Sequence, residues 1–445
     1  MGQTTDFKPR KHLNADALIR VLRSEFQHVP DSTPHLSKTA LADALMSGYA
    51  VFALKDPSLL AFEKRRSDPN MHTLFRIDCV PSDTHMRTML DEVEPQQLAG
   101  AYRQVFAQVQ RGKVLQQYRY LDESYLLLFD GVEYHRSKNV HCDKCLVCHH
   151  RNGTVSYYHQ MLGAVIAHPD LAAVIPLMPE PIQRQDGGDK GDCERTAAKR
   201  AMRRIAKEHP HLRFIVTEDA LSANGPHIEL IREFQWHYII VVKPKDHTEL
   251  FAQVAARIET EQIQPYSYLD PETGVIHCYR WVNQVPLNKS HAHLLVNFLE
   301  YWEIGPNLQV QYFNSWVTDF ECQRANVGDI KCGGRARWKI ENETFNTLKN
   351  QGYHFEHNYG HGHKNLSVIF ALLMMLAFAV DQIQQSSNVL FQAAWEKCGS
   401  KRELWERIRS AFRELLLESL WELYAVVAYG HVKKRPVLYT SADTS

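Results

Sequence analysis

The chain lacks the features that mark membrane-spanning and strongly charged proteins. Its 51 basic and 51 acidic residues give a net charge of +0, so any basic surface for a nucleic acid must be local. The longest apolar run, residues 366–380, has about 15 residues, whereas a bilayer-spanning helix needs roughly 20. This run therefore predicts a buried helix rather than a membrane span.

A secretion signal and a disulfide framework are also missing. The first residues, MGQTTDFKPRKH, contain no apolar core of a signal peptide. Nine cysteines are an odd number in a chain of 445 residues, which argues against paired disulfides and fits a reducing compartment. We therefore expect a cytoplasmic protein.

Hydrophobic periodicity divides the chain into an α-helical beginning and an α/β middle. Residues 1–112 are predicted to form a helical module that includes the basic cluster Lys64-Arg65-Arg66. Beyond it, the order is three strands, helix, strand, helix, strand, helix. The predicted strands are residues 124–130, 154–168, 171–177, 212–219 and 238–243, and the helices are residues 193–208, 225–234 and 247–260. This is the element order of a ribonuclease-H-like core.

The second half of the chain interrupts this core and then completes it. Residues 113–262 are its first part, residues 263–320 a β-rich insertion with strands at 275–284, 293–302 and 308–318, and residues 321–385 its completion. Residues 386–445 are a helical C-terminal region. The predicted class is α/β, with a ribonuclease-H-like catalytic core interrupted by a β-rich insertion and flanked by helical regions.

Three acidic residues are expected to meet in this fold. Asp130 and Asp219 lie at equivalent ends of two strands that should be parallel neighbours, where the sites of α/β sheets form. Glu341 lies on a helix predicted over residues 333–349, and Arg337 is on the same helical face because it is four residues away. Carboxylates are the ligands that Mg²⁺ prefers, and Asp130 is placed to bridge two ions.

The chain resembles the DDE transposases of bacterial insertion sequences, of the cut-and-paste type with a β-strand insertion. The resemblance is carried by LLFDGVEYHRSKNVHC, YYHQMLGAVIAHPD, VTEDALSAN and, most specifically, GRARWKIENETFNTLKNQGYHFEHNYGHGHKNLS. It implies that Asp130, Asp219 and Glu341 are the catalytic triad and hold two Mg²⁺ ions, for which Mn²⁺ would substitute.

The resemblance also implies partners. These are double-stranded DNA, both the terminal inverted repeats bound by the N-terminal module and the target DNA, and a second copy of the chain in a synaptic homodimer. Such an enzyme cleaves DNA and transfers strands, without a membrane partner, in the bacterial cytoplasm and on the nucleoid when bound to DNA.

The match around Glu341 is incomplete. The family pattern is Tyr, two residues, Arg, three residues, Glu, six residues, Lys. Arg337 and Glu341 match, but Gly334 stands at the Tyr position, and Lys349 is one residue late. Arg337 and Lys349 are expected to contact DNA. The family's base-stacking Trp has three candidates in the insertion, Trp281, Trp302 and Trp316; we assign Trp281, with packing in the core as the alternative.

A cysteine cluster supports a separate hypothesis. Cys142, Cys145 and Cys148, flanked by His141 and His149, could form a Cys₃His zinc site, but free buried thiols are the default. Further along the chain, His357, His361 and His363 could approach phosphates, but we expect them to pack against the core. Two alternative functions follow: a catalytically inactive DNA-binding relative of the transposases, and a zinc-dependent hydrolase built on the cysteine loop.

Overall fold

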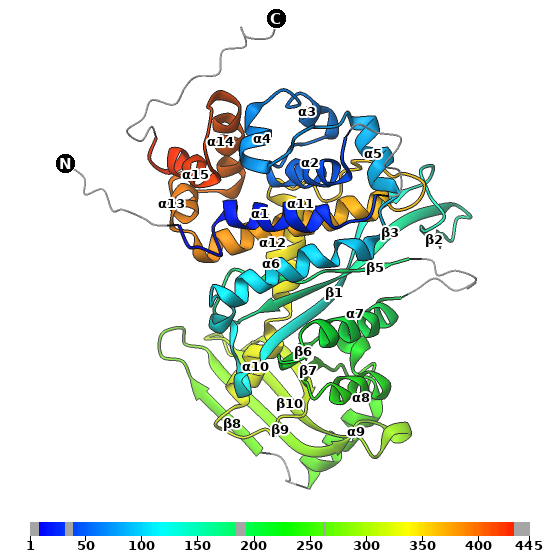
Figure 1. The fold of residues 1–445 in the computed structure, drawn as a ribbon. Helices are drawn as coiled ribbons and strands as arrows, with labels where there is room; N and C mark the ends of the chain where they lie inside the picture. Colours follow the sequence, from blue (N-terminus) through cyan, green and yellow to red (C-terminus); the bar gives the residue numbers. More distant parts are fainter. Residues whose placement is uncertain (1–8, 32–38, 184–192, 261–263, 431–445) are drawn as a thin grey trace, which may run out of the picture.

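The protein is a mixed α/β structure in which one long sheet carries helices on both faces. The computed structural model describes residues 9–31, 39–183, 193–260 and 264–430. Figure 1 shows a helical body above the sheet, built from the two ends of the chain, and the strands of the insertion below. One connected set of buried apolar side chains runs through both parts.

The described residues form an 11-stranded sheet with the order β2-β3-β1-β6-β7-β11-β10-β9-β8, in which β4 and β5 pair with β3. The central strand β1 is antiparallel to β3 and parallel to β6, and β6 is parallel to β7. The first half of the sheet consists of β1 (Tyr125–Ser137), β2 (Leu146–His149), β3 (Val155–Ala167), β4 (Ile175–Pro176), β5 (Glu180–Ile182), β6 (Phe214–Thr217) and β7 (His237–Val241).

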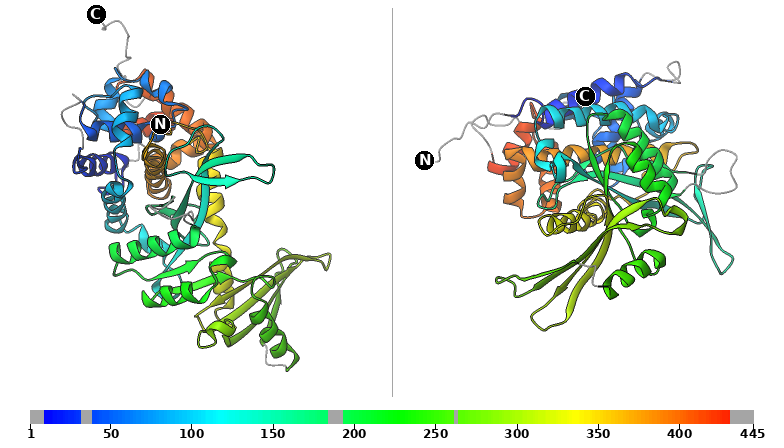
Figure 2. Two further views of the ribbon diagram at one scale, coloured as in Figure 1. Left: turned by 90° about the vertical axis from the view of Figure 1, so that its right-hand side faces the viewer. Right: turned by 90° about the horizontal axis from the view of Figure 1, so that it is seen from below.

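Helices cover both faces of this half. Figure 2 (left) shows α7 and α8 on one face, and α10 with its continuation on the other. The three helices predicted between and after the strands are confirmed as α7 (Glu194–Glu208), α8 (Gly225–Glu233) and α9 (Thr248–Glu259).

Two strand predictions need correction. β1 does not end at Asp130 but continues to Ser137, because its outer half still pairs with β3. The strand predicted at residues 171–177 is mostly absent. Two short strands, β4 and β5, take its place along β3. Leu177 and Met178 between them are buried, and the backbone N–H of Leu177 donates to the carbonyl of Ala164 in β3 at 2.9 Å.

The predicted β-rich insertion is confirmed, but it extends the sheet of the core. Its strands are β8 (Gln264–Leu269), β9 (Ile276–Pro286), β10 (Leu295–Ile304) and β11 (Val310–Thr318), and β11 pairs antiparallel with β7. β8 was not predicted. In Figure 2 (left) these strands project away from the helical body.

The helix predicted over residues 333–349 begins earlier and is irregular. α10 spans Val327–Arg335, a turn follows at Ala336 and Arg337, and the π-helical segment η6 (Ile340–Asn346) leads into α11 (Thr347–Asn350). Gly334 lets α10 approach β11 closely: a Cβ there would lie 2.4 Å from Nε1 of Trp316, which is 0% exposed. A Tyr in this position would have no space beside the Trp316 ring.

This close approach predicts different effects for two glycines of α10. Gly334→Ala should lower the free energy of unfolding by about 1–3 kcal/mol, because the buried Trp316 ring cannot move away without repacking. Gly328→Ala is the matched control; a Cβ at Gly328 meets nothing within 4 Å, and the better helix propensity of Ala should leave stability equal or up to about 1 kcal/mol higher. Urea denaturation measures both, and equal stabilities would contradict the close-packing argument.

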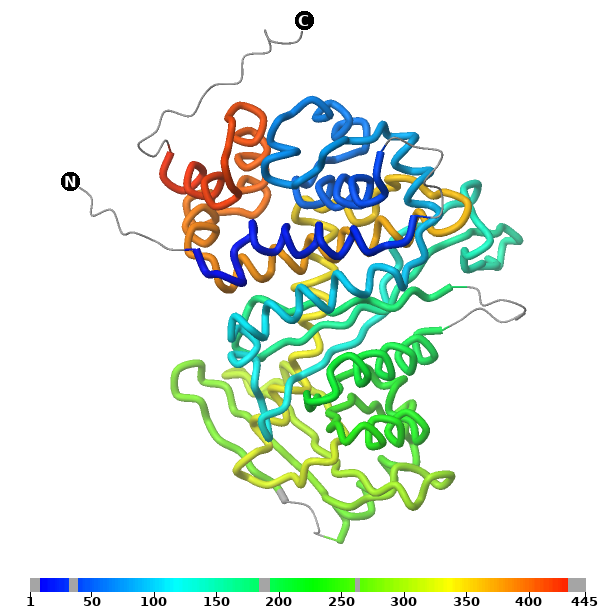
Figure 3. Tube along the Cα trace, viewed as in Figure 1, coloured from blue at the N-terminus to red at the C-terminus, as the bar shows by residue number. Residues whose placement is uncertain are grey.

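The two ends of the chain pack together in the helical body. Figure 3 shows the N-terminal segments (blue) lying against the C-terminal ones (orange to red). The asparagine Asn70 donates to the carbonyls of Phe412 and Leu415, both at 2.7 Å, and the carboxylate of Asp16 accepts from the backbone N–H of Leu420 at 2.7 Å. Residues 1–112 and 386–445, assigned above to separate regions, thus share one core where the structure describes them.

The helical body is built around α12, which packs against α1, α2, α5, α6 and α13. Its helices are α1 (Ala15–Gln27), α2 (Leu41–Ala53), α3 (Leu59–Glu63), α4 (Pro69–Phe75), α5 (Asp83–Asp91), α6 (Ala99–Arg111), α12 (Leu366–Ser387), α13 (Val389–Cys398), α14 (Lys401–Glu414) and α15 (Leu420–Tyr429). Short 3₁₀ turns lie at Pro95–Leu98, Leu115–Tyr118, Leu121–Glu123, Ala220–Ser222 and Lys289–His291.

The predicted buried helix is confirmed as α12. Among the described residues it is the one helix long and apolar enough to cross a membrane, but 94% of its most apolar stretch is buried inside the protein.

Candidate functional site

Asp130 and Asp219 lie side by side at the point where β1 and β6 stop pairing. The parallel register sets Leu128 opposite Thr217, so Asp130 and Asp219 each follow two residues later. Asp130 is in the middle of β1, and Asp219 lies in the turn just after β6, where its carboxylate accepts from the backbone N–H of Leu221 at 3.1 Å. Parallel pairing therefore brings together two acids that are far apart in the sequence.

Glu341 reaches the same place from the other side of the fold. Asp130 pairs with Gly163 of β3, and a Cβ on Gly163 would lie 2.7 Å from the ring of Phe345, so η6 packs directly on this face of the sheet. Arg337 links the acids: its guanidinium lies 2.7 Å from the Glu341 carboxylate and 3.9 Å from that of Asp130.

A fourth carboxylate, which the sequence did not single out, belongs to Glu194. It is the first residue of α7 and accepts from the Gln160 amide at 2.6 Å. Partial burial and the neighbouring Asp219 raise the pKa of Glu194. An acid at the start of a helix is common in any protein, so its position could not have been recognised without the fold.

The crowding of carboxylates has a clear electrostatic effect on Asp130. Burial is the largest cause, and together with the charges of Glu341, Glu194 and Asp219 it raises the pKa of Asp130 to about 7, against the opposite pull of Arg337. Strongly shifted carboxyl pKa values are enriched at functional sites. A cation bound beside Asp130 would lower the pKa of its carboxyl again.

Other predicted DNA contacts lie away from this cluster or are buried. Lys349 forms an ion pair with Glu356 at 2.8 Å. The Trp281 side chain is packed in the insertion and only 7% exposed, which favours the core role over base stacking. In the N-terminal basic cluster, Arg65 is buried and bound to Asp56 at 2.8 and 2.9 Å, which leaves Lys64 and Arg66 exposed.

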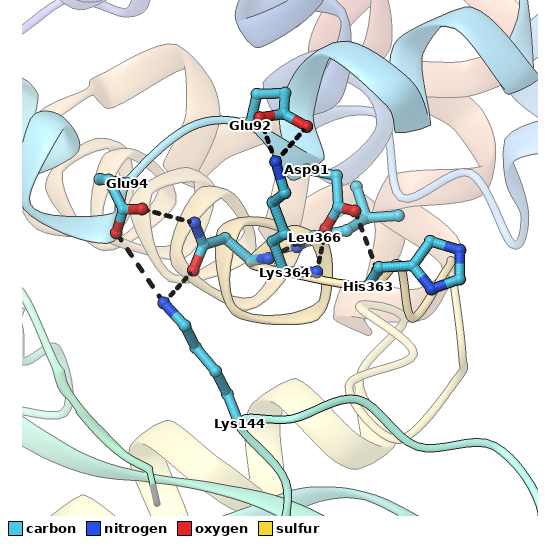
Figure 4. Close-up of polar contacts among 8 residues, drawn as sticks. Asp91, Glu92, Glu94, Lys144, His363, Lys364 and Leu366 are labelled. Carbon is cyan, nitrogen blue, oxygen red and sulfur yellow. Dashed lines mark hydrogen bonds and ion pairs between the residues drawn. The ribbon is translucent and has the colours of Figure 1, made fainter. Parts of the chain in front are cut away.

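The segment that follows α11 is held in place by Asp91 (Figure 4). The carboxylate of Asp91, at the end of α5, accepts from the backbone N–H groups at the start of α12: His363 at 2.9 Å, Lys364 at 3.0 Å, Asn365 at 2.9 Å and Leu366 at 2.9 Å. Partial burial acts in the opposite direction, but these donors lower the pKa of Asp91. The chain that leaves the Glu341 helix is thereby tied to the helical body.

The cysteine loop forms a different cluster from the predicted one. Cys142, Cys145, His159 and His361 place one ligand atom each within 4.8 Å of one another, and no other such group of three or more His, Cys, Asp or Glu is found in the described ranges. Cys148 is not part of it, because β2 pairs Cys148 with Ser156 and carries it away from the loop. His361 joins the cluster rather than merely packing against the core.

No family model matches the chain, and no curated protein matches its sequence.

The raised pKa of Asp130 predicts a pH-dependent effect of Asp130→Asn on stability. Because the folded state binds this proton more tightly than the unfolded state, stability is lost as pH rises from about 4 through about 7. In buffer without Mg²⁺, the melting temperature of Asp130→Asn should therefore exceed that of wild type by roughly 2 °C more at pH 8 than at pH 5. Asp246→Asn, on an exposed loop, is the control; a gain from Asp130→Asn that is the same at both pH values would contradict the assignment.

Proposed function

We propose that the chain is a DDE-type DNA transposase, which cleaves DNA at the terminal repeats of its element and joins the freed strands to target DNA. The observation that carries the proposal is the meeting of Asp130, Asp219 and Glu341, from three distant parts of the chain, around Arg337. The strand order around β1 supports it, because β4 and β5, β3, β1, β6 and β7 follow one another as in a ribonuclease-H-like core.

The donor set fits divalent ions. Asp130, Asp219 and Glu341 supply hard carboxylate oxygens, with Glu194 as a fourth, and burial together with the neighbouring carboxylates raises the pKa of Asp130 to about 7. Arg337 lies within ion-pair distance of two of these carboxylates, those of Asp130 and Glu341. Two divalent ions bound here would activate water or a 3′-hydroxyl and neutralise charge on the phosphate.

Arg337 has a second task in this proposal. Its planar guanidinium suits bidentate contact with a phosphate, and its side chain is 23% exposed, so it can leave the carboxylates when other cations satisfy them. Arg195 and Arg203 on the exposed side of α7 lie on the helix that begins at Glu194 and add positive charge for the DNA backbone. Arg200 does not add to this, because it binds Glu180 at 2.8 Å.

The test is cleavage of a labelled duplex built from the inverted repeats that flank the gene, with and without Mg²⁺. Wild type should cut at the repeat boundary only with Mg²⁺. Asp130→Asn and Glu341→Gln should each lose roughly 10³-fold in rate and still bind the duplex, because they remove charge at the site and leave the fold intact.

Glu343→Gln is the matched control on the same segment. Glu343 lies two residues beyond Glu341. Burial lowers the pKa values of Lys339 and Lys401, and the negative charge of Glu343 acts against this lowering. Because Glu343 interacts with these lysines instead, this variant should cut at the wild-type rate. Wild-type cleavage by Glu341→Gln would remove the triad from the mechanism. Binding without any cleavage, the same in all four proteins, would instead support the inactive DNA-binding relative.

A further inference from the structure

Two thiols and two imidazoles converge beside β1, outside the carboxylate site. Cys142 and Cys145 lie in the loop between β1 and β2, His159 is on β3, and His361 lies between α11 and α12. His159 is 1% exposed, Cys145 2% and His361 7%. Cys142 is partly buried. The burial of three such side chains next to it needs a specific cause, because each carries a polar group that loses its contact with water.

The distances between the ligand atoms match a tetrahedral zinc site. Zinc binds sulfur at about 2.3 Å and nitrogen at about 2.0–2.1 Å, so tetrahedral geometry puts two sulfurs about 3.8 Å apart and sulfur about 3.5 Å from nitrogen. The Sγ atoms of Cys142 and Cys145 are 3.9 Å apart. Nε2 of His159 lies 3.4 Å from Sγ of Cys142 and 3.5 Å from Sγ of Cys145, and Nε2 of His361 lies 3.4 Å from Sγ of Cys145.

Hydrogen bonding alone explains this arrangement poorly. Sγ of Cys145 faces Cys142, His159 and His361 at once, although a thiol has one hydrogen to donate and sulfur is a weak acceptor. A cation at the centre would satisfy all four atoms together. Two thiolates and two neutral imidazoles are a common structural zinc set.

We propose that Cys142, Cys145, His159 and His361 bind one Zn²⁺ that fastens the loop after β1 to the segment after the Glu341 helix. Four protein ligands leave no open position for a substrate, so the site is structural, which disfavours the zinc-dependent hydrolase. Cys145 and His361 are 216 residues apart in the sequence. The zinc would therefore link the strand that carries Asp130 to the chain that continues from Glu341.

A hydrogen bond close to this site also joins the cysteine loop to the start of α12. Lys144, between the two cysteines, donates to the side chain of Asn365 at 2.8 Å, and Figure 4 shows it reaching from the cysteine loop towards the start of α12. The segment between α11 and α12 is thus held by Asp91 on one side and approached by the cysteine loop on the other. Zinc would convert this weak polar contact into a fixed junction.

The experiment measures the metal content of the full-length protein, expressed with zinc in the medium and purified without chelators. Wild type should hold about one zinc per chain. Cys145→Ser and His361→Ala should each lose most of it. Cys148→Ser is the matched control from the adjoining strand β2, and it should keep its zinc because β2 pairs Cys148 with Ser156 of β3.

Cobalt substitution keeps the proposal testable if a variant does not fold. Wild type loaded with Co²⁺ should show the intense visible bands of tetrahedral coordination and a thiolate-to-cobalt charge-transfer band. Chelation should lower the melting temperature, and Zn²⁺ but not Mg²⁺ should restore it. The proposal would be overturned if wild type neither retained zinc nor took it up on titration. It would also be overturned if Cys148→Ser lost as much zinc as Cys145→Ser, or if the purified protein contained a Cys142–Cys145 disulfide. None of these results depends on DNA cleavage.

Discussion

Repulsion among carboxylates at the centre of the sheet is the constraint on which the proposed activity depends. Asp130, Asp219, Glu341 and Glu194 come from four segments, and Arg337 offsets only part of their charge. Such a cluster persists only where the surrounding structure fixes it more strongly than the charges repel. The parallel register of β1 with β6 and the direct packing of η6 on Gly163 provide this fixation.

The sequence predicted those features of the carboxylate site that depend on neighbouring residues in the chain. Short apolar runs predicted β1, β3, β6 and β7 in the correct order, and four-residue spacing placed Arg337 beside Glu341. It could not show that β1 continues past Asp130, because that depends on the length of its partner β3. Nor could the sequence identify Glu194, because its position near the other carboxylates depends on where α7 begins in the fold.

The cysteine loop illustrates the same limit. The spacing Cys142-x2-Cys145-x2-Cys148 suggested three ligands from one loop, but the pairing of β2 with β3 takes Cys148 out of reach. The partners that replace it come from β3 and from a segment far along the chain. Close packing of α10 on Trp316 likewise explains Gly334, which a motif comparison alone could only record as a mismatch.

The helical body has a consequence for how the protein is made. Buried Lys55, just after α2, binds Asp381 of α12, and the two are 326 residues apart in the sequence. A ribosome adds about 5–20 residues per second, so roughly 16–65 s pass between the synthesis of α2 and the synthesis of α12, which covers its apolar face. The N-terminal helices therefore cannot complete their fold until α12 has been synthesised, and chaperones that hold exposed apolar helices are expected to determine how much folded protein a cell obtains.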